Sequence, residues 1–378
     1  MKTRRVFLDN AATTPIDPSI VDMMTNMMKI NYGNPSSIHS FGRESKTLVE
    51  KSRKTIANLL NTSPSNIFFT SGGTEADNMA IKCSINDYDI KHAITSKISH
   101  HAVLYPLQDL EEEKKIELSY VDIDKYGIVS LDHLEDLLKS RPRTFVSIMH
   151  ANNEIGTIQP LKEIGDICKK YDAIFHSDTV QTMAHFPFDI KELDVHFMAA
   201  SAHKFHGPKG VGFIYISEDI NISPMIRGGE QERKMRAGTE NVLGIAALAT
   251  AMEISYKNLD EDIKYIKDIK LYMIEQLKIQ LPNVGFYAKC TDIDNSLYTV
   301  LSIYFPKEED HEMLFFNLDI MGIACSGGSA CASGGTKGSH VFSNIMPDKD
   351  VTGIRFSFSK YTTRDDIDYT INALKTLI

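Results

Sequence analysis

A lysine and an aspartate, each at the end of an apolar run, are the residues whose types and positions favour one specific chemistry. Lys204 follows the run Val195–Ala200, and Asp178 ends the run Ala173–Asp178. A lysine amine in a partly desolvated pocket becomes a nucleophile for carbonyl groups. A carboxylate at the carboxyl end of a parallel sheet lies where α/β folds bind ligands. Together they suggest that Lys204 forms a Schiff base with pyridoxal phosphate while Asp178 pairs with the ring nitrogen of that cofactor.

Cys331 is a candidate nucleophile in the last part of the chain. It lies in a run rich in Gly, Ser and Ala, residues 323–339, whereas a structural cysteine normally sits among large apolar neighbours. A thiol on a solvent-reachable loop is useful because it can react. Taken by itself, the run fits an ordinary turn with an incidental cysteine equally well.

The segment Thr70–Asp77 is predicted to join a strand to a helix through Gly72 and Gly73. Free N–H groups and the positive end of a helix dipole make such a junction a natural phosphate cradle. Thr74 with Asp77 is predicted to form a capping box, with Asp in place of the usual Glu. The motif alone is weak, because it has neither the Walker lysine nor a full GxGxxG pattern.

Polar residues elsewhere have both a functional and a structural interpretation. His100 can stack on a planar cofactor and move protons, and Asn153 can donate to a phenolate oxygen, although either can be purely structural. Arg355 lies alone in an apolar strand, so an anion should meet it, either a substrate carboxylate or an internal Asp or Glu. The charged, Gly-containing run at residues 228–241 is either a solvated loop or a second contributor to anion binding.

Metal binding is the rival interpretation of the histidines around Asp178. Histidine and carboxylate are suitable ligands, but the spacings match no HExxH or other compact metal-binding pattern, so pyridoxal phosphate is favoured. The residues concerned are His176, Asp178, His185, His203 and His206.

The composition predicts a cytoplasmic globular protein. The 378 residues carry a net charge of −9, which does not favour non-specific nucleic-acid binding, and no window is apolar enough to span a membrane. The N-terminus has no signal-peptide pattern. Five cysteines, an odd number without a CxxC pair, indicate reduced thiols rather than a disulfide framework.

Alternation of helical and β-rich stretches predicts an α/β fold. The run Glu44–Leu60 has helical periodicity, and continuous apolar runs between helices are typical of buried parallel strands. A charged helix over Met252–Leu281 is expected next, and a final helix over Arg364–Leu377. The predicted strands are Ile67–Thr70, Thr144–Met149, Ala173–Asp178, Val195–Ala200, Val211–Ile216, Tyr298–Phe305 and Gly353–Phe358. A shift in character predicts a boundary near residue 255, with a large domain over 15–255 and a small one over 256–378 that carries the cysteine loop at about 323–342.

The order of these motifs along nearly the whole chain resembles the NifS/IscS-type cysteine desulfurases, which are fold type I pyridoxal-phosphate enzymes. That fold has a large domain with a mainly parallel central sheet flanked by helices, and a smaller α+β domain. The resemblance implies that residues 1–14 also belong to the small domain, together with 256–378. The motifs that carry the resemblance are Leu8–Thr14, Gly33–His39, Thr70–Asn78, His150–Gly156, His203-Lys204, Arg236–Asn241, Gly328–Cys331 and Gly353–Ser359.

The resemblance implies a role for each matching residue. Lys204 holds the cofactor and removes the Cα proton of L-cysteine, Asp178 pairs with the ring nitrogen, and His100 stacks on the ring. Asn153 and Gln181 contact the phenolic oxygen. The substrate carboxylate is bound by Arg355 with help from Asn34. The residues implied to hold the phosphate are Gly73, Thr74, Ser201, His203 and, from the second subunit of a homodimer, Thr239.

The reaction implied by the resemblance is conversion of L-cysteine to L-alanine, with the sulfur captured as a persulfide on Cys331. Lys337, His340 and His100 are candidates for activating that thiol, and Cys325 is either a sulfur relay or incidental. Ser99 stands where the family often has an acidic residue. The chain ends without the C-terminal tail that often docks an iron–sulfur scaffold, so the scaffold and a tRNA-thiolation enzyme are equally open as sulfur acceptors.

Two alternatives to a desulfurase follow from the same residues. One is a related pyridoxal-phosphate lyase or aminotransferase, for example a selenocysteine lyase, in which Cys331 has no catalytic role. The other is a catalytically silent member that acts as a binding protein. The joint presence of Lys204, Asp178, Arg355 and Cys331 argues against the silent member.

Overall fold

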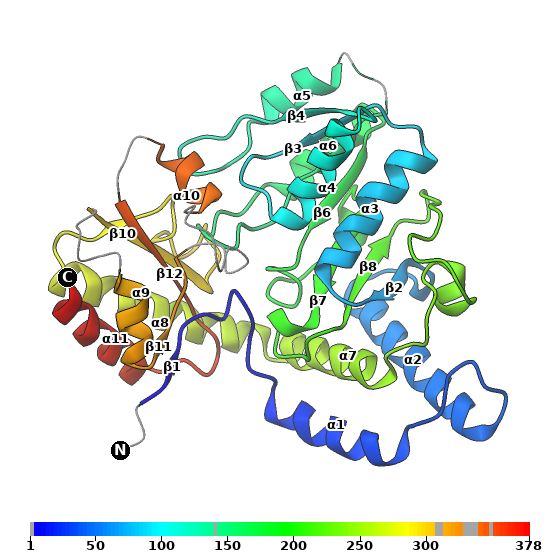
Figure 1. The fold of residues 1–378 in the computed structure, drawn as a ribbon, viewed down its shortest axis with the longest axis horizontal. Helices are drawn as coiled ribbons and strands as arrows, with labels where there is room; N and C mark the ends of the chain where they lie inside the picture. Colours follow the sequence, from blue (N-terminus) through cyan, green and yellow to red (C-terminus); the bar gives the residue numbers. More distant parts are fainter. Residues whose placement is uncertain (1–3, 140, 142, 307–312, 328–338, 348–350) are drawn as a thin grey trace.

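Two groups of strands, linked by consecutive helices, form the framework of the protein (Figure 1). The computed structural model describes residues 4–139, 141, 143–306, 313–327, 339–347 and 351–378. The larger group is a seven-stranded sheet, and the smaller group consists of a three-stranded and a two-stranded sheet. No helix among the described residues is long and apolar enough to cross a membrane.

The seven-stranded sheet is mainly parallel, which confirms the predicted fold class. Its strands, in spatial order, are β2 (Ile67–Thr70), β8 (Gly212–Ile216), β7 (Phe197–Ser201), β6 (Ile174–Asp178), β5 (Phe145–Ser147), β3 (His92–Thr95) and β4 (Glu117–Tyr120). Strand β8 runs antiparallel to both of its neighbours, β7 and β2. The prediction that the run Val211–Ile216 is a parallel strand was therefore wrong.

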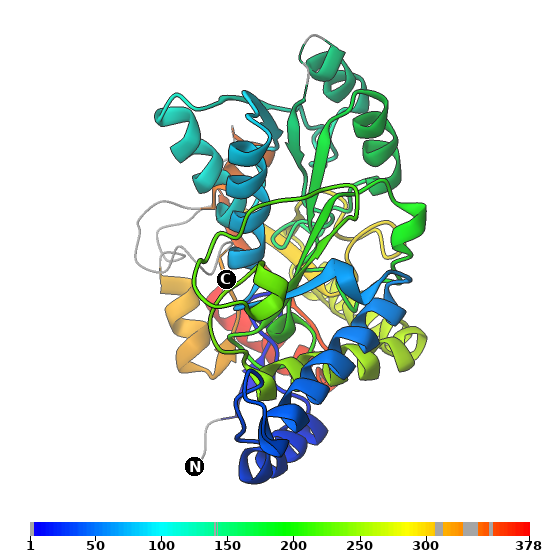
Figure 2. The same ribbon diagram turned by 90° about the vertical axis from the view of Figure 1, so that its right-hand side faces the viewer.

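Helices cover both faces of this sheet. Successive strand residues point to opposite faces, so strands that are apolar throughout must be covered on both sides. Phe68 packs with one set of helices, whereas Ile67 and Phe69 pack with the other. Figure 2 views the sheet edge-on, with α3 (Gly73–Asp87) and α4 (His101–Glu112) on one side. The other face is covered by α1 (Pro18–Ile30), α2 (Ser40–Leu59), α5 (Leu131–Lys139), α6 (Leu161–Lys170) and α7 (Val242–Lys257).

The smaller sheets share an apolar cluster of their own, which contains Val6 and Leu8 from the start of the chain and Ile354 and Phe356 from its end. The three-stranded sheet has the antiparallel order β12 (Val351–Ser357), β10 (Val300–Pro306), β9 (Gly285–Phe286). Strand β1 (Val6–Phe7) pairs with β11 (Ile323–Ala324) in the two-stranded sheet. The accompanying helices are α8 (Leu259–Gln280), α9 (Leu314–Ile320), α10 (His340–Ile345) and α11 (Arg364–Leu377).

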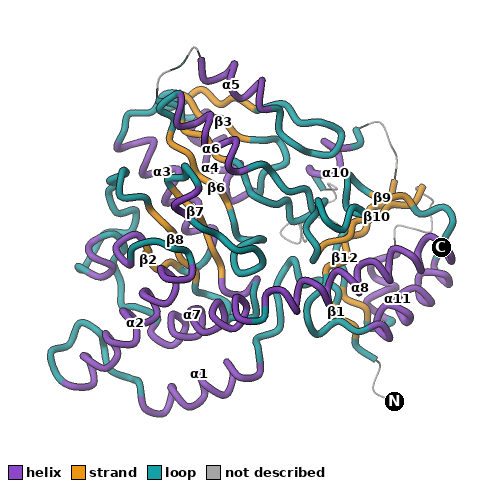
Figure 3. The backbone as a smooth tube through the Cα atoms, turned by 180° about the vertical axis from the view of Figure 1, so that it is seen from behind, coloured by secondary structure: helices purple, strands orange, loops and turns teal. Residues whose placement is uncertain are grey.

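Helices α7 and α8 run end to end beneath both groups of strands, as Figures 1 and 3 show. The predicted single helix Met252–Leu281 was wrong, because the chain leaves helical geometry at Asn258, which ends α7 and precedes α8. The predicted bounds of α11 are confirmed, and α2 starts four residues before the predicted Glu44. The Thr363 side chain and Asp366 form a capping box, which explains the sharp start of α11.

Candidate active site

A cavity of about 180 Å³ lies at the carboxyl ends of β5, β6 and β7. This is the edge at which doubly wound sheets bind ligands, because the strand ends and the helix N-termini face the same side. The residues predicted to bind the cofactor that line the cavity are Gly73, Thr74, His100, Asn153, Asp178, Gln181, Ser201, His203 and Lys204. Segments far apart in the sequence therefore converge on one space.

One end of the cavity is formed by the turn from β2 to α3. Gly72 has φ +155° and precedes α3 without a side-chain cap, so the predicted Thr74–Asp77 capping box was wrong. A Cβ on Gly73 would stand 2.5 Å from a methyl carbon of Val180, which also lines the cavity. The turn thus packs closely on the segment after β6 and leaves the first N–H groups of α3 for an anion.

Asp178 and Asp77 form an acidic pair deep in the cavity wall. An Asp178 carboxylate oxygen accepts a hydrogen bond from the Val180 N–H at 3.0 Å. Burial, and then the negative charge of Asp178, raises the pKa of Asp77 well above its ordinary value. Burial lowers the pKa of His176 to about 3, and its Nε2 lies 3.3 Å from Asp77. Burial beside Asp178 therefore disfavours the charged form of Asp77, which leaves Asp178 as the carboxyl group better placed to meet a cation.

The lining role of Asp77 was missed from the sequence. The sequence pattern places Asp77 only in a helix cap, whereas the helix begins two residues earlier than a Thr74 cap would require. Once Gly73 is the first helical residue, Asp77 falls on the buried face with Ala76 and Ala80. The buried face of α3 could be predicted only once the first residue of the helix was known.

Lys204 reaches the cavity from a 3₁₀ turn, Ala202–Lys204, directly after β7. Its Nζ donates to the backbone carbonyl oxygens of Ala11 and Ala12 at 2.6 and 2.9 Å. The Gln181 side chain donates to the same Ala11 carbonyl at 3.0 Å. A backbone strap from the start of the chain thus holds the amine at the cavity wall.

His100 is the N-cap of α4, and its Nδ1 accepts a hydrogen bond from the Ala102 N–H at 3.1 Å. Burial, opposed by the charge of Asp178 and helped by Lys204, lowers the pKa of His100. The neutral imidazole therefore carries its proton on Nε2, since Nδ1 is the acceptor. Such a ring can stack on a planar ligand and exchange a proton through Nε2.

Arg355 lies in β12 beside the cavity rather than in its lining, and its side chain is 1% exposed. Its Nη1 donates to the Asn153 carbonyl at 3.1 Å, and its Nη2 donates to Asp9 at 2.8 Å. Asn153 itself lines the cavity, so Arg355 is bonded directly to a lining residue. Asp9 is thus the internal acid that the sequence had left open as one partner for Arg355.

The remaining predicted residues lie apart from the cavity or outside the described part of the chain. Asn34 and Thr239 are exposed and do not line the cavity of their own subunit. Cys331 and Lys337 lie outside the described residues. Burial, followed by the charge of Asp9, raises the pKa of Cys325 to about 12, so Cys325 is a protonated thiol at neutral pH and a poor nucleophile.

The histidines considered for a metal are engaged in protein hydrogen bonds. His185 contacts the Tyr298 hydroxyl and the Lys204 carbonyl, both at 3.0 Å, and His206 contacts the Pro15 carbonyl at 2.9 Å. His203 contacts the Thr13 hydroxyl at 3.1 Å. Over the residues that the structure describes, no group of three or more His, Cys, Asp or Glu is placed to hold a metal ion.

Comparison with known proteins assigns the chain to a family. The profile of the class-V aminotransferases matches residues 6–370. The chain belongs to this family. It is 42% identical to a cysteine desulfurase IscS of Dictyoglomus turgidum, over 99% of this chain and 95% of the relative. It is 39% identical to a cysteine desulfurase IscS of Methanosarcina thermophila, over 100% of this chain and 93% of the relative.

Solved structures of class-V relatives have the same fold. A NifS-like protein superposes with a TM-score of 0.91 at 36% identity, covering 99% of both chains. A NifS-like protein from Rickettsia africae superposes with a TM-score of 0.87 at 34% identity, again over 99% of both chains. Within the class-V aminotransferases, the chain therefore groups with the cysteine desulfurases, as its motifs had indicated.

Proposed function

We propose that the protein is a pyridoxal-phosphate-dependent cysteine desulfurase that converts L-cysteine to L-alanine. Its full-length relatives carry that name. The single observation that carries the proposal is the meeting of Lys204, Asp178 and His100 in one cavity with the glycine turn before α3. A lysine, a carboxylate, a flat imidazole and an anion cradle are the groups that a pyridoxal-phosphate enzyme needs.

The cavity fits pyridoxal phosphate at each of the cofactor's reactive ends. The uncapped N-terminus of α3, with Gly73, Thr74, Ser201 and His203 around it, offers N–H and side-chain donors for the phosphate. Asp178 would pair with the ring nitrogen, and Asn153 and Gln181 would contact the phenolic oxygen. Lys204 would hold the cofactor through Nζ, and the His100 ring would stack on it.

Bound in this cavity, pyridoxal phosphate supplies a sink for the electron pair left when the substrate loses its Cα proton. The residues of the chain would carry out the proton movements. Lys204 would take the Cα proton through Nζ, from a position held by the Ala11 and Ala12 carbonyls. His100, neutral and protonated on Nε2, would exchange a proton with the substrate. Arg355 would hold the substrate carboxylate, helped by Asn34.

Cys331 is proposed as the sulfur acceptor. Its thiolate would attack the substrate sulfur, so that a sulfur–sulfur bond forms while the bond between Cβ and sulfur breaks. The electron pair of the broken bond remains with the carbon fragment, which takes up protons and leaves as alanine. The persulfide on Cys331 would then pass its outer sulfur to an acceptor protein, either an iron–sulfur scaffold or a tRNA-thiolation enzyme.

The proposal extends to assembly and domain organisation. The enzyme would act in the cytoplasm as a homodimer in which Thr239 of one subunit reaches the phosphate site of the other. Support comes from the exposure of Thr239 away from the cavity of its own subunit. The separate apolar clusters support a large domain over 15–255 and a small one from 1–14 and 256–378.

Sulfur transfer from L-cysteine is the direct test. Purified wild type and Cys331→Ser are given L-cysteine, and alanine and sulfide are measured while the cofactor spectrum is recorded. We expect both proteins to be yellow and to respond spectrally to cysteine, with sulfur transfer only in wild type. Unimpaired desulfuration by Cys331→Ser would remove the nucleophile role, and a colourless protein that cannot bind pyridoxal phosphate would overturn the whole proposal.

A further inference from the structure

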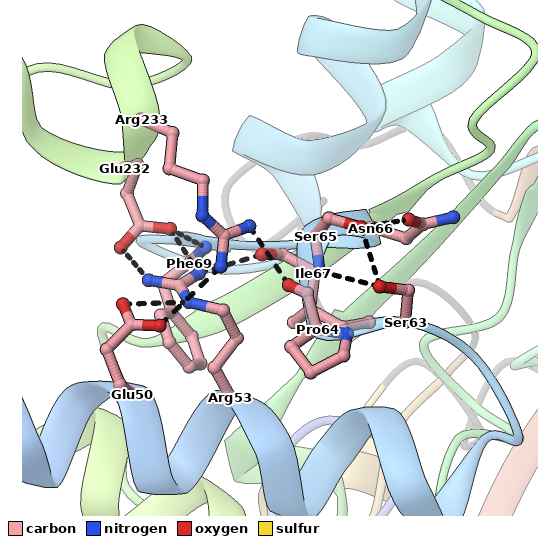
Figure 4. A network of polar contacts seen from close by, with 10 residues as sticks. All are labelled: Glu50, Arg53, Ser63, Pro64, Ser65, Asn66, Ile67, Phe69, Glu232 and Arg233. Carbon is pink, nitrogen blue, oxygen red and sulfur yellow. Dashed lines mark hydrogen bonds and ion pairs between the residues drawn. The ribbon is translucent and has the colours of Figure 1, made fainter.

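A buried ion pair joins two segments far from each other in sequence, Arg53 in α2 and Glu232 in the connection between β8 and α7 (Figure 4). Their side chains are 2% and 3% exposed. The two guanidinium Nη atoms each donate to one Glu232 oxygen at 2.8 Å, a bidentate arrangement. Arg53 also donates to the Ile67 carbonyl at 2.7 Å, and Glu232 accepts from the Phe69 N–H at 2.8 Å.

The segment that contains Glu232 has an unfavourable backbone conformation. Glu232, Arg233 and Lys234 have φ values of 44°, 55° and 71°, all in the left-handed region. None of the three is glycine, and each such residue costs about 1 kcal/mol or more. A stretch of this kind persists only where surrounding contacts hold it. Arg53 and the Phe69 N–H hold its first residue, Glu232, and Arg233 donates to the Pro64 carbonyl at 3.0 Å.

A second contact fixes the other end of the segment near the glycine turn. Arg236 meets Glu75, in the first turn of α3, with Nε 2.9 Å from one carboxylate oxygen and Nη2 3.3 Å from the other. The same carboxylate accepts from the Ser71 N–H at 2.8 Å. Three residues beyond Arg236, Thr239 is exposed. The segment is thus anchored at Glu232 and at Arg236, and it presents Thr239 outward.

We infer that Arg53 and Glu232 are positioning residues for the cofactor site of the second subunit. By fixing residues 231–239 they hold Thr239 where it reaches the partner's phosphate site. This inference rests on the homodimer of the proposed function. A buried ion pair contributes little net stability compared with apolar residues of similar volume, so stability alone gives no reason for this pair. A segment that is already ordered loses less entropy when it binds, and this gives a functional reason for the buried pair.

The first test removes the ion pair while retaining an acceptor for the Phe69 N–H. In Arg53→Met/Glu232→Gln the buried charges are gone, and the amide oxygen of the introduced glutamine can still accept that bond. We expect the dissociation constant for pyridoxal phosphate, measured by absorbance titration well below the unfolding temperature, to rise about tenfold because the segment is no longer pre-ordered. An unchanged dissociation constant, with or without a lower unfolding temperature, would show that the pair is merely structural.

The second test determines which subunit's site loses affinity for the cofactor. It uses differently tagged chains purified as mixed dimers. In one dimer, the Arg53→Met/Glu232→Gln chain is paired with a Lys204→Ala chain, so the only lysine-bearing site receives Thr239 from an intact segment. In the other, wild type is paired with a chain carrying all three substitutions, so the only lysine-bearing site receives Thr239 from the altered segment. We expect wild-type cofactor affinity in the first dimer and the tenfold loss in the second. The reverse pattern would overturn the inference.

Two further variants complete the design. Thr239→Val, at an exposed position that does not threaten folding, should give the same pattern in the mixed dimers. Arg364→Gln/Asp268→Asn removes an exposed pair of equal length, 2.8 Å, with side chains 57% and 54% exposed, and should leave cofactor affinity unchanged. A wild-type protein that binds no pyridoxal phosphate would instead overturn the proposed function, and this inference with it.

Discussion

The two halves of the molecule each bury an arginine, and the two differ in how completely they are paired. Arg53, beside the seven-stranded sheet, uses all three guanidinium nitrogens, with Glu232, the Ile67 carbonyl and, through Nε at 3.2 Å, Glu50. Its charge also lies 4.7 Å from the centre of the Phe69 ring. Arg355, in the three-stranded sheet, is as deeply buried, yet its Nε has no hydrogen-bond partner among the described residues.

The difference separates an arginine whose nitrogens are all bonded within the protein from one that has capacity for a ligand. A buried donor without a partner is costly, so a native structure that keeps one calls for an explanation. Arg355 shares Asp9, which is 19% exposed, with the Ser326 hydroxyl, whereas Glu232 is 3% exposed and bound in bidentate fashion. The three guanidinium nitrogens of Arg53 are therefore all used in contacts within the protein. Arg355 is suited to bind the carboxylate of a ligand.

The largest expected effect is on the stability of the large sheet. Arg53→Met leaves Glu232 buried without a counter-charge, so we expect the free energy of unfolding to fall by about 3–5 kcal/mol. Arg355→Met should cost about 1–3 kcal/mol, because the partly exposed Asp9 can be hydrated. Urea denaturation of both apo-proteins measures the two losses. Equal losses would break the comparison between the arginines.

The next effect is on substrate affinity. Arg355→Lys keeps the charge but loses the planar fork, so we expect the KM for L-cysteine to rise about 30- to 100-fold. Cysteamine, which lacks the carboxylate, is the matched probe, and its binding in a spectral titration should be the same in wild type and variant. If cysteamine binding weakens as much as cysteine binding does, Arg355 acts on the shape of the site rather than on the carboxylate.

Seven of the observed strands were predicted from the sequence with residue ranges, whereas β1, β3, β4, β9 and β11 were not, and neither was the direction of β8. Residues 211–216 form a continuous apolar run because both faces of the sheet are covered. Such a run does not indicate whether the strand is parallel or antiparallel to its neighbours. The break at Asn258 was missed although the sequence carries signals for it, since Lys257 lies in the last turn of α7 and acidic residues fill the first turn of α8. In contrast, α11 begins at a capping box and was predicted with its observed bounds.

The cavity residues other than Asp77 that were predicted follow apolar runs, and parallel strands bring their carboxyl ends together. Contacts across the chain were not predictable in this way. Asp9 lies 346 residues from Arg355, and Glu232 lies 179 residues from Arg53. Nothing in local periodicity relates such positions, because their proximity depends on how the elements pack.

The smallest expected effect concerns Asp9, whose hydrogen bond with Arg355 would compete with a substrate carboxylate for that arginine. Asp9→Asn removes a negative charge near the incoming carboxylate while retaining an oxygen that can accept from Arg355 and Ser326. We expect the KM for L-cysteine to fall about two- to fivefold at low ionic strength, since one repulsive charge near a partly exposed site is worth about 1 kcal/mol or less. The gain should shrink as salt screens the charge. If the KM rises instead, towards that of Arg355→Lys, Asp9 orients the arginine more than it competes, and the incomplete pairing of Arg355 is not what makes it available.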